Sequence, residues 1–237
     1  MKNKFQNSKV VSRDKRLARE HSNTQARFTW EHKAVGNHRA QSAAGTLEYY
    51  KQIRAYRYGY ETPFIPEFFK FSDLHGKRVL EVGVGNGIDG VEMMQNGACY
   101  TGIDITRNHL DLTRRYIELE RNSGHDLDVE NIIEGDLLES ELPGDYDVIY
   151  SFGVLHHIAH ESEYLEQLHK LLSEQGELRI AVYSKFSFFN FWMAITWLFK
   201  NRMQNSFSDW QSHLAEDSHL GDPVVIKIRN RNRVIWV

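Results

Sequence analysis

One segment of the chain reads Val79-Leu80-Glu81-Val82-Gly83-Val84-Gly85-Asn86-Gly87. Its first half has the apolar pattern of a buried strand, and its alternating glycines predict a turn that leads into a helix. Such a turn normally offers bare backbone N–H groups to an anion. Glu81 beside the turn would repel an anion, so the segment favours a ligand that carries a positive charge.

Strand and helix patterns alternate on the carboxyl side of this turn. The sequence predicts strands at 78–82, 99–104, 129–134, 146–151 and 177–183, with helices at 87–95, 107–121 and 161–172. This alternation implies right-handed crossovers and an α/β fold with a doubly wound, mostly parallel, Rossmann-like sheet that has helices on both faces. Two short runs at 224–229 and 233–237 predict a closing antiparallel hairpin, which gives about seven strands, although a shortened sheet is the alternative.

The residues before the first strand predict a helical cap. Residues 1–40 are polar, without a sustained period, and we expect much of this arm to be mobile. Apolar and aromatic residues then recur three or four positions apart from Leu47 to Tyr60, as on one face of a helix. We therefore expect an arm and cap at 1–70 and a ligand-binding domain at 71–237.

The glycine turn resembles the first motif of the class I S-adenosylmethionine-dependent methyltransferases. The similarity continues through Ile103-Asp104-Ile105, Glu134-Gly135-Asp136-Leu137 and Asp147-Val-Ile-Tyr-Ser151-Phe-Gly153-Val-Leu-His156-His157, and covers residues 76–184. Its Gly-Val-Leu-His-His segment is similar to small-molecule and quinone methyltransferases in particular. S-adenosylmethionine, which has an amino group and a sulfonium, also fits the acidic turn better than a pyrophosphate does.

The resemblance implies a cofactor site at the carboxyl ends of the strands, where ligands bind in open parallel sheets. Glu81 would hold the methionine end, Asp104 both ribose hydroxyls, and Asp136 the adenine amino group, with a backbone donor from Leu137. Asp104 is alternatively a capping residue for the following helix, for which Thr106 is a plausible N-cap. The other positions that the resemblance places at the cofactor are Gly83, Val84, Gly85, Asn86, Gly87, Ile105, Ser151, Phe152 and Gly153.

Two adjacent histidines, His156 and His157, are the candidate general bases, because imidazole titrates near neutral pH. Methyl transfer from a sulfonium is an in-line displacement that positioning and desolvation can drive. The histidines are therefore either a base or part of the loop structure. Aromatic residues that could line an acceptor pocket and contact the sulfonium are Tyr49, Tyr56, Tyr60 and Tyr183.

The cap helix also carries Arg54 and Arg57, three positions apart and so on one helix face. Such a pair could bind a carboxylate of the substrate. Exposure of both arginines to solvent is the other explanation.

The resemblance implies an enzyme that moves the methyl group of S-adenosylmethionine to oxygen or nitrogen of an acceptor and releases S-adenosylhomocysteine. Ser151-Phe-Gly153-Val stands where methylases of exocyclic DNA amines carry Asn/Asp-Pro-Pro-Tyr, and the net charge of −3 also argues against a nucleic-acid partner. The acceptor is then a small molecule, a lipid, a peptide or a carrier-bound intermediate.

Two alternative functions remain. Gly85-Asn-Gly87-Ile-Asp-Gly90 satisfies the dinucleotide fingerprint, which allows an NAD(P)-dependent oxidoreductase. A methyltransferase-like subunit that binds the cofactor only to support a partner is the other.

Composition sets the expected compartment. Cys99 is the sole cysteine, so neither a disulfide framework nor a Cys-rich metal site is expected. The first residues lack the apolar segment of a secretory signal, and the apolar run at 186–199 is shorter than the roughly 20 residues that cross a bilayer. We therefore expect a cytoplasmic protein without a transmembrane segment, and the sequence does not predict its oligomeric state.

Overall fold

The structure is a computed structural model of the chain. It describes residues 37–155 and 161–183, Ile158 and the backbone of 224–230 and 233–236. It also describes separate residues near the two ends, which are Glu20, Asn23, Thr24, Arg27, Phe28, Trp30, Glu31, Phe191, Trp192, Ile195 and Leu198.

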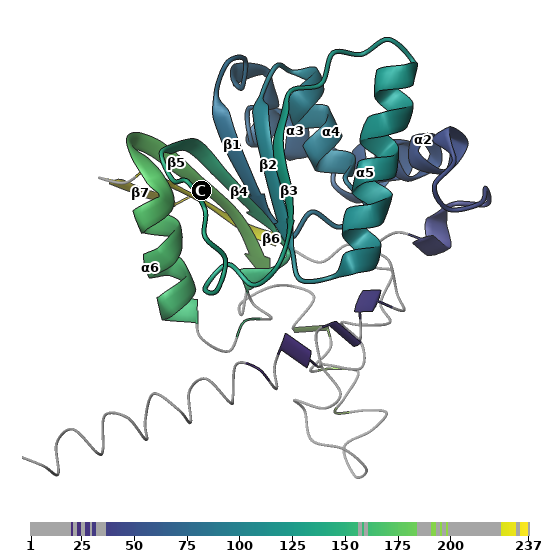
Figure 1. The fold of residues 1–237 in the computed structure, drawn as a ribbon. Helices are drawn as coiled ribbons and strands as arrows, with labels where there is room; N and C mark the ends of the chain where they lie inside the picture. The colour runs from purple at the N-terminus through teal and green to yellow at the C-terminus, as the bar shows by residue number, and fades with distance from the viewer. Residues whose placement is uncertain are drawn as a thin grey trace, which may run out of the picture.

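In the described part of the chain, seven strands form one sheet in the order β3-β2-β1-β4-β5-β6-β7 (Figure 1). Five neighbouring strands are parallel, β6 is antiparallel to β5, and β7 is antiparallel to β6. The predicted parallel Rossmann-like sheet is therefore confirmed, with a parallel part of five strands. The strands are β1 (Arg78–Val82), β2 (Cys99–Asp104), β3 (Val129–Glu134), β4 (Tyr146–Phe152), β5 (Leu172–Tyr183), β6 (Val224–Asn230) and β7 (Arg233–Trp236).

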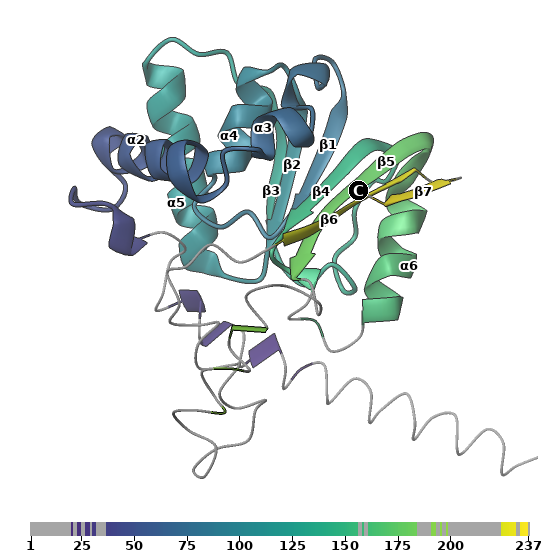
Figure 2. The ribbon, with the colours of Figure 1, turned by 180° about the vertical axis from the view of Figure 1, so that it is seen from behind.

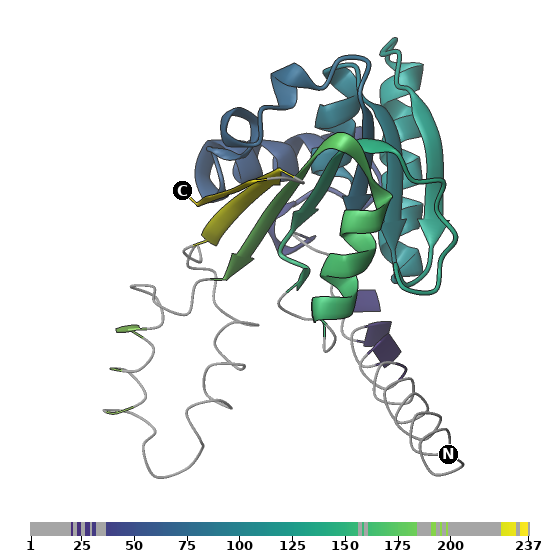
Figure 3. The same ribbon diagram turned by 90° about the vertical axis from the view of Figure 1, so that its left-hand side faces the viewer.

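Helices cover both faces of the sheet (Figure 1 and, from the side, Figure 3). α4 (Ile88–Gln95) and α5 (Arg107–Asn122) lie on one face, and α6 (Glu161–Leu171) lies on the other. Because successive side chains of a strand point to opposite faces, Val79 of β1 packs in the core with α4 and α5. Leu80 packs in the core with α6.

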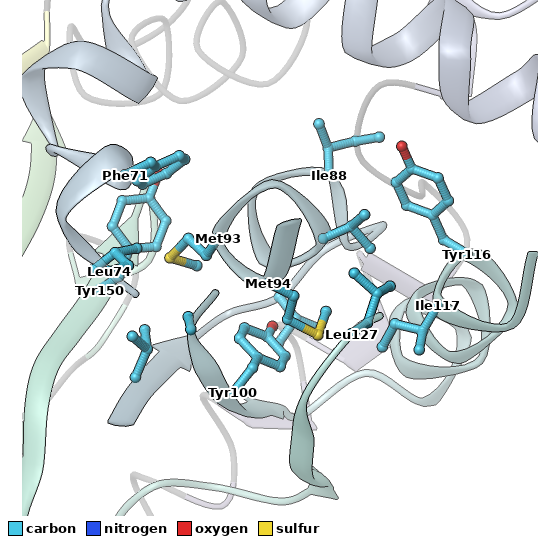
Figure 4. Packing of buried hydrophobic residues seen from close by; sticks show 14 of the residues in the cluster. Phe71, Leu74, Ile88, Met93, Met94, Tyr100, Tyr116, Ile117, Leu127 and Tyr150 are labelled. Carbon is cyan, nitrogen blue, oxygen red and sulfur yellow. The ribbon is translucent and has the colours of Figure 1, made fainter. Parts of the chain in front are cut away.

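The core under α4 and α5 is rich in sulfur and aromatic side chains (Figure 4). In this view Met93 of α4 lies towards Phe71 and Tyr150, whereas Met94 lies towards Tyr100 of β2. All five side chains are almost fully buried. Burying a side chain of this size contributes roughly 1.5–3 kcal/mol, so this layer fixes α4, and with it the end of the glycine turn.

The predicted cap forms helices that pack against α4 and α5 (Figure 2). Its helix α2 (Leu47–Tyr56) has Thr46 as the N-cap, whose side chain accepts a hydrogen bond from the backbone N–H of Tyr49. The Tyr50 ring stacks on Tyr116 of α5 at 4.2 Å between centroids. The cap thus shares the core of the sheet. Its elements are η1 (Asn37–Arg39), α2 (Leu47–Tyr56), η2 (Arg57–Glu61), α3 (Ile65–Phe68) and η3 (Phe71–Asp73).

Among the described residues, no helix is long and apolar enough to cross a membrane. The apolar run at 186–199 lies mostly outside that set. Within the same part of the chain, no three metal-ligating side chains come together.

Candidate functional site

The glycine turn begins directly after β1. Gly83, Gly85 and Gly87 have positive φ angles of 83°, 53° and 81°, a region that glycine adopts without a steric penalty. The chain also crowds two of them, because a Cβ at Gly83 would overlap the Val154 side chain and one at Gly87 would lie 2.9 Å from the Thr113 hydroxyl. The backbone conformation thus favours glycine at all three positions, and crowding adds a second reason at Gly83 and Gly87.

Most residues that were expected at the cofactor are buried, among them Val84, Asn86 and Leu137. Val84 and Leu137 belong to the two hydrophobic cores, so their side chains pack inside the protein. Asn86 is also buried, and the Tyr49 hydroxyl from α2 lies beside its side chain. Ile105 at the end of β2 is half-buried.

The loop after β4 meets the glycine turn. Ser151 donates a hydrogen bond from its hydroxyl to the Val82 carbonyl at 3.1 Å, which ties the end of β4 to the end of β1. Gly153 donates its backbone N–H to the Ala181 carbonyl of β5. The strand order reverses between β1 and β4, and ligands of open α/β sheets bind at such a point.

Asp104 connects the end of β2 to the glycine turn. Its Oδ1 accepts the backbone N–H of Thr106 at 2.8 Å, and its Oδ2 accepts that of Gly85 at 3.3 Å. Thr106 stands at the N-cap of α5, but its side chain makes no capping hydrogen bond. The prediction of Thr106 as the N-cap residue is thus confirmed, but the carboxylate that binds the helix start is that of Asp104.

Sequence reasoning missed His109 of α5. This side chain is buried, and its Nδ1 lies 3.4 Å from Asp104 Oδ2. Its Nε2 has no hydrogen-bond partner within the described part of the chain. The available signal was its place on the buried stripe of α5 with Leu110 and Thr113, one turn after the end of β2.

Asp136, after β3, is surrounded by donors. Oδ1 accepts the Leu138 backbone N–H at 2.9 Å and the Tyr164 hydroxyl at 2.7 Å. Oδ2 accepts the side-chain amide of Asn23 at 2.6 Å. Asn23 belongs to the N-terminal arm, so an arm that was expected to be largely mobile contacts the site through at least this residue.

Glu81 lies on the α4 side of the sheet. Only 3% of it is exposed, and the Tyr100 hydroxyl donates a hydrogen bond to its Oε2. Gly90 of α4 leaves the necessary room, since a Cβ there would lie 2.8 Å from that oxygen. Burial raises the pKa of Glu81 well above its usual value, and the charge of Asp89 adds to the effect.

Asp89, in the first turn of α4, is the centre of a buried network. Arg57 binds both of its oxygens, and the hydroxyls of Tyr58 and Tyr150 each donate to it at 2.7 Å. Burial alone would raise the pKa of Asp89, but the charge of Arg57 and these hydrogen bonds outweigh burial and lower it. Arg57 is thus neither solvated nor available to a substrate carboxylate.

The remaining predicted residues fall into two groups. His156 and His157 lie outside the described residues, as does the side chain of Tyr183. The rings of Tyr56 and Tyr60 contact each other with centroids 5.4 Å apart, and Tyr60 is largely exposed. An acceptor-lining role for these tyrosines stays a prediction.

Comparison with known proteins agrees with this geometry. Residues 80–178 match the family model described as a methyltransferase domain. This segment is therefore similar to methyltransferase domains. It contains the glycine turn, Asp104, Asp136 and the loop after β4.

Two curated relatives share this domain. The chain is 32% identical over 112 residues to the ubiquinone biosynthesis O-methyltransferase of Pseudomonas aeruginosa. The aligned segment covers 47% of each protein. It is 29% identical over 147 residues to the protein of the same name from Neisseria meningitidis serogroup C, covering 61% of this chain and 60% of the relative. The chain thus spans about half the length of the relatives that it matches.

A solved structure resembles most of the chain. The magnesium protoporphyrin IX methyltransferase of Synechocystis PCC 6803, crystallised with bound SAH, superposes with a TM-score of 0.53 and 19% sequence identity. The match covers 82% of this chain and 88% of that protein. At this identity the likeness concerns the fold alone.

Proposed function

We propose that the chain is an S-adenosylmethionine-dependent methyltransferase that acts on an oxygen atom of a small-molecule acceptor. The observation that carries the proposal is the contact of Asp104 with both the Gly85 N–H and the Thr106 N–H. This contact brings the acid of the second strand to the glycine turn at the point where the strand order reverses. The match of residues 80–178 to the methyltransferase-domain family supports it.

The donors and acceptors of the site fit the adenosine half of the cofactor. Asp104 would hold the ribose hydroxyls, and His109 Nε2, on the side of the ring away from Asp104, would be a further acceptor when Nδ1 carries the ring proton and donates it to Asp104. Asp136 already holds the NH₂ group of Asn23, which is the kind of donor that adenine offers. For Glu81 we propose support of the turn from the α4 side, and its predicted contact with the methionine end stays a prediction.

S-adenosylmethionine, when bound, supplies the electrophilic methyl group. The part of the chain is to align the acceptor and to exclude water, which can account for much of the rate of a displacement reaction. His156 or His157 would take the proton from an acceptor hydroxyl. Tyr56, Tyr60 and Tyr183 are the proposed walls of the acceptor pocket.

The acceptor class is inferred from the relatives. Both are named for O-methylation in ubiquinone biosynthesis, so we propose an aromatic hydroxyl, of the kind found on quinone precursors, as the acceptor group. The names of these relatives do not support a lipid, peptide or carrier-bound acceptor.

The experiment is methyl transfer from methyl-labelled S-adenosylmethionine to matched aromatic acceptors that carry either a hydroxyl or an amine. We expect transfer to a hydroxyl, and a fall in kcat of about 100-fold or more in His156→Gln or His157→Gln with unchanged affinity for S-adenosylhomocysteine. Transfer to the amines alone would contradict the proposed oxygen acceptor. Normal kcat in both variants would show that neither histidine acts as a general base, and that the site works by positioning alone.

A further inference from the structure

The arm residue Asn23 makes the longest-range polar contact of the site. Its side-chain nitrogen donates to Asp136 Oδ2 at 2.6 Å across a separation of 113 residues. Asp136 is only 2% exposed with the arm in this position. An amine from solution therefore has no open path to this carboxylate while Asn23 is in place.

A second part of the arm lies over the next strand end. Asn108 in the first turn of α5 donates its side-chain amide to the Glu31 carbonyl at 3.3 Å. The Trp30 ring lies 6.5 Å from the ring of His109, the histidine that faces Asp104. The described arm residues thus lie beyond the carboxyl ends of the strands (Figures 1 and 3).

The chemistry of the Asn23 contact matches that of a ligand. A side-chain amide and an adenine each present a planar NH₂ donor, and a carboxylate accepts such a donor strongly. Leu138 and Tyr164 already occupy Oδ1 of Asp136. The oxygen that Asn23 binds is therefore the one that a ligand amine would need.

We propose that Asn23 is a latch that occupies the adenine subsite and must leave Asp136 before the adenine amino group binds there. The proposal rests on the proposed function, which assigns Asp136 to adenine. A ligand that binds only the open form has an apparent Kd equal to the intrinsic Kd divided by the open fraction. Removing the Asn23 amide raises that fraction and tightens binding.

The first test uses the full chain with Asn23→Ala and titration with S-adenosylhomocysteine. We expect the Kd to fall by about 3- to 10-fold, the scale of the net contribution of one ordinary intramolecular hydrogen bond. Thr24→Ala is the matched control, because the Thr24 hydroxyl donates to the Glu20 carbonyl within the arm and does not bind Asp136. The control should leave the Kd unchanged.

The outcomes separate the latch from the function. Weaker or equal binding by Asn23→Ala, with normal binding by the wild type, would overturn the latch and make Asn23 a wall of the pocket. No binding of S-adenosylhomocysteine by the wild type or by either variant would overturn the proposed function and the latch with it.

Hydrogen exchange of the unmodified chain gives an independent answer. On addition of S-adenosylhomocysteine we expect faster exchange in peptides that contain Asn23 and slower exchange in peptides that contain the turn 83–87. Protection of both sets of peptides would show that the arm closes onto the ligand, which contradicts a latch.

Discussion

Two pairs of buried carboxylates differ in what holds them. Glu81 and Asp89 lie beside α4 and are bound by side chains of the core and the cap, above all Tyr100 and Arg57. Asp104 and Asp136 lie at the strand ends, where they accept backbone N–H groups, contact the buried side chains of His109 and Tyr164, and are bound by the arm.

The difference separates stability from binding. Arg57 and Tyr100 are packed parts of the fold, so their contacts cannot be exchanged without loss of the core. The donor that Asn23 gives to Asp136 comes from the arm, and such a contact can be replaced by a ligand. We call Glu81 and Asp89 the inner pair and Asp104 and Asp136 the outer pair. We infer that the inner pair holds the fold and that the outer pair receives the cofactor.

The largest expected effect is on the inner pair. Arg57→Met leaves Asp89 buried without its cation, and breaking a buried ion pair in this way costs about 3–5 kcal/mol. The free energy of unfolding from urea titrations followed by circular dichroism measures the loss.

Arg54→Met is the matched control on the same helix face. Arg54 pairs with Glu92 at 2.6 Å, but 45% of its side chain is exposed, compared with 14% for Arg57. Solvent screens such a pair, so the loss should stay below about 1 kcal/mol. Equal losses of unfolding free energy in Arg54→Met and Arg57→Met would show that the buried Arg57–Asp89 pair is no more important for stability than the exposed Arg54–Glu92 pair.

The next effect concerns the outer pair. Asp104→Asn keeps the shape of the side chain but removes the charge that would accept the ribose hydroxyls. We expect affinity for S-adenosylhomocysteine to fall by about 1.5–3 kcal/mol, with a smaller loss of stability than in Arg57→Met. Calorimetric titration and urea unfolding of the same preparation measure both quantities, and unchanged affinity would refute the ribose role.

A smaller effect is expected from Tyr150→Phe, which removes one of the hydroxyls that donate to Asp89. The hydrogen bond goes to a charged acceptor, so the free energy of unfolding should fall by about 1–2 kcal/mol. Affinity for S-adenosylhomocysteine should not change, because Asp89 belongs to the inner pair. A large loss of affinity would show that the two pairs are not separate.

The last expected effect is on the pH dependence of stability. The pKa of Glu81 is raised in the folded chain, mainly by burial. Its contribution is therefore fully present below the unfolded value, near 4.5, and is lost as pH rises through the folded pKa. Glu81→Gln should remove this loss, so its stability should decline less than that of the wild type towards neutral pH.

Asp89 changes stability with pH in the opposite direction to Glu81, because Arg57 lowers the pKa of Asp89. Its contribution is present above the unfolded pKa and is lost as pH falls.

Parallel pH profiles for Glu81→Gln and the wild type would contradict the Glu81 prediction, because they would show that Glu81 does not ionise in this range.

Local patterns predicted the sheet. Apolar runs and glycine turns gave β1 and β2 with the observed bounds, and α4 starts one residue after its expected start. Such features depend on neighbours in sequence, so periodicity and turn chemistry are enough to detect them.

Long-range polar contacts could not be predicted. Nothing in the polar arm pairs Asn23 with Asp136, since 113 residues separate them. The spacing of Arg57 on its helix shows which face it occupies but not that Asp89, 32 residues away, lies opposite. Burial and partners of polar groups come from tertiary packing, which one helix pattern does not contain.

The central claim is that the outer carboxylates form a site for S-adenosylmethionine. Calorimetric titration of the wild-type chain with S-adenosylhomocysteine and, in parallel, with NADH tests it most directly. We predict saturable binding of S-adenosylhomocysteine that Asp104→Asn weakens, and no binding of NADH. Binding of NADH with no response to S-adenosylhomocysteine would contradict the account and favour the dinucleotide site that the Gly85 to Gly90 fingerprint allows.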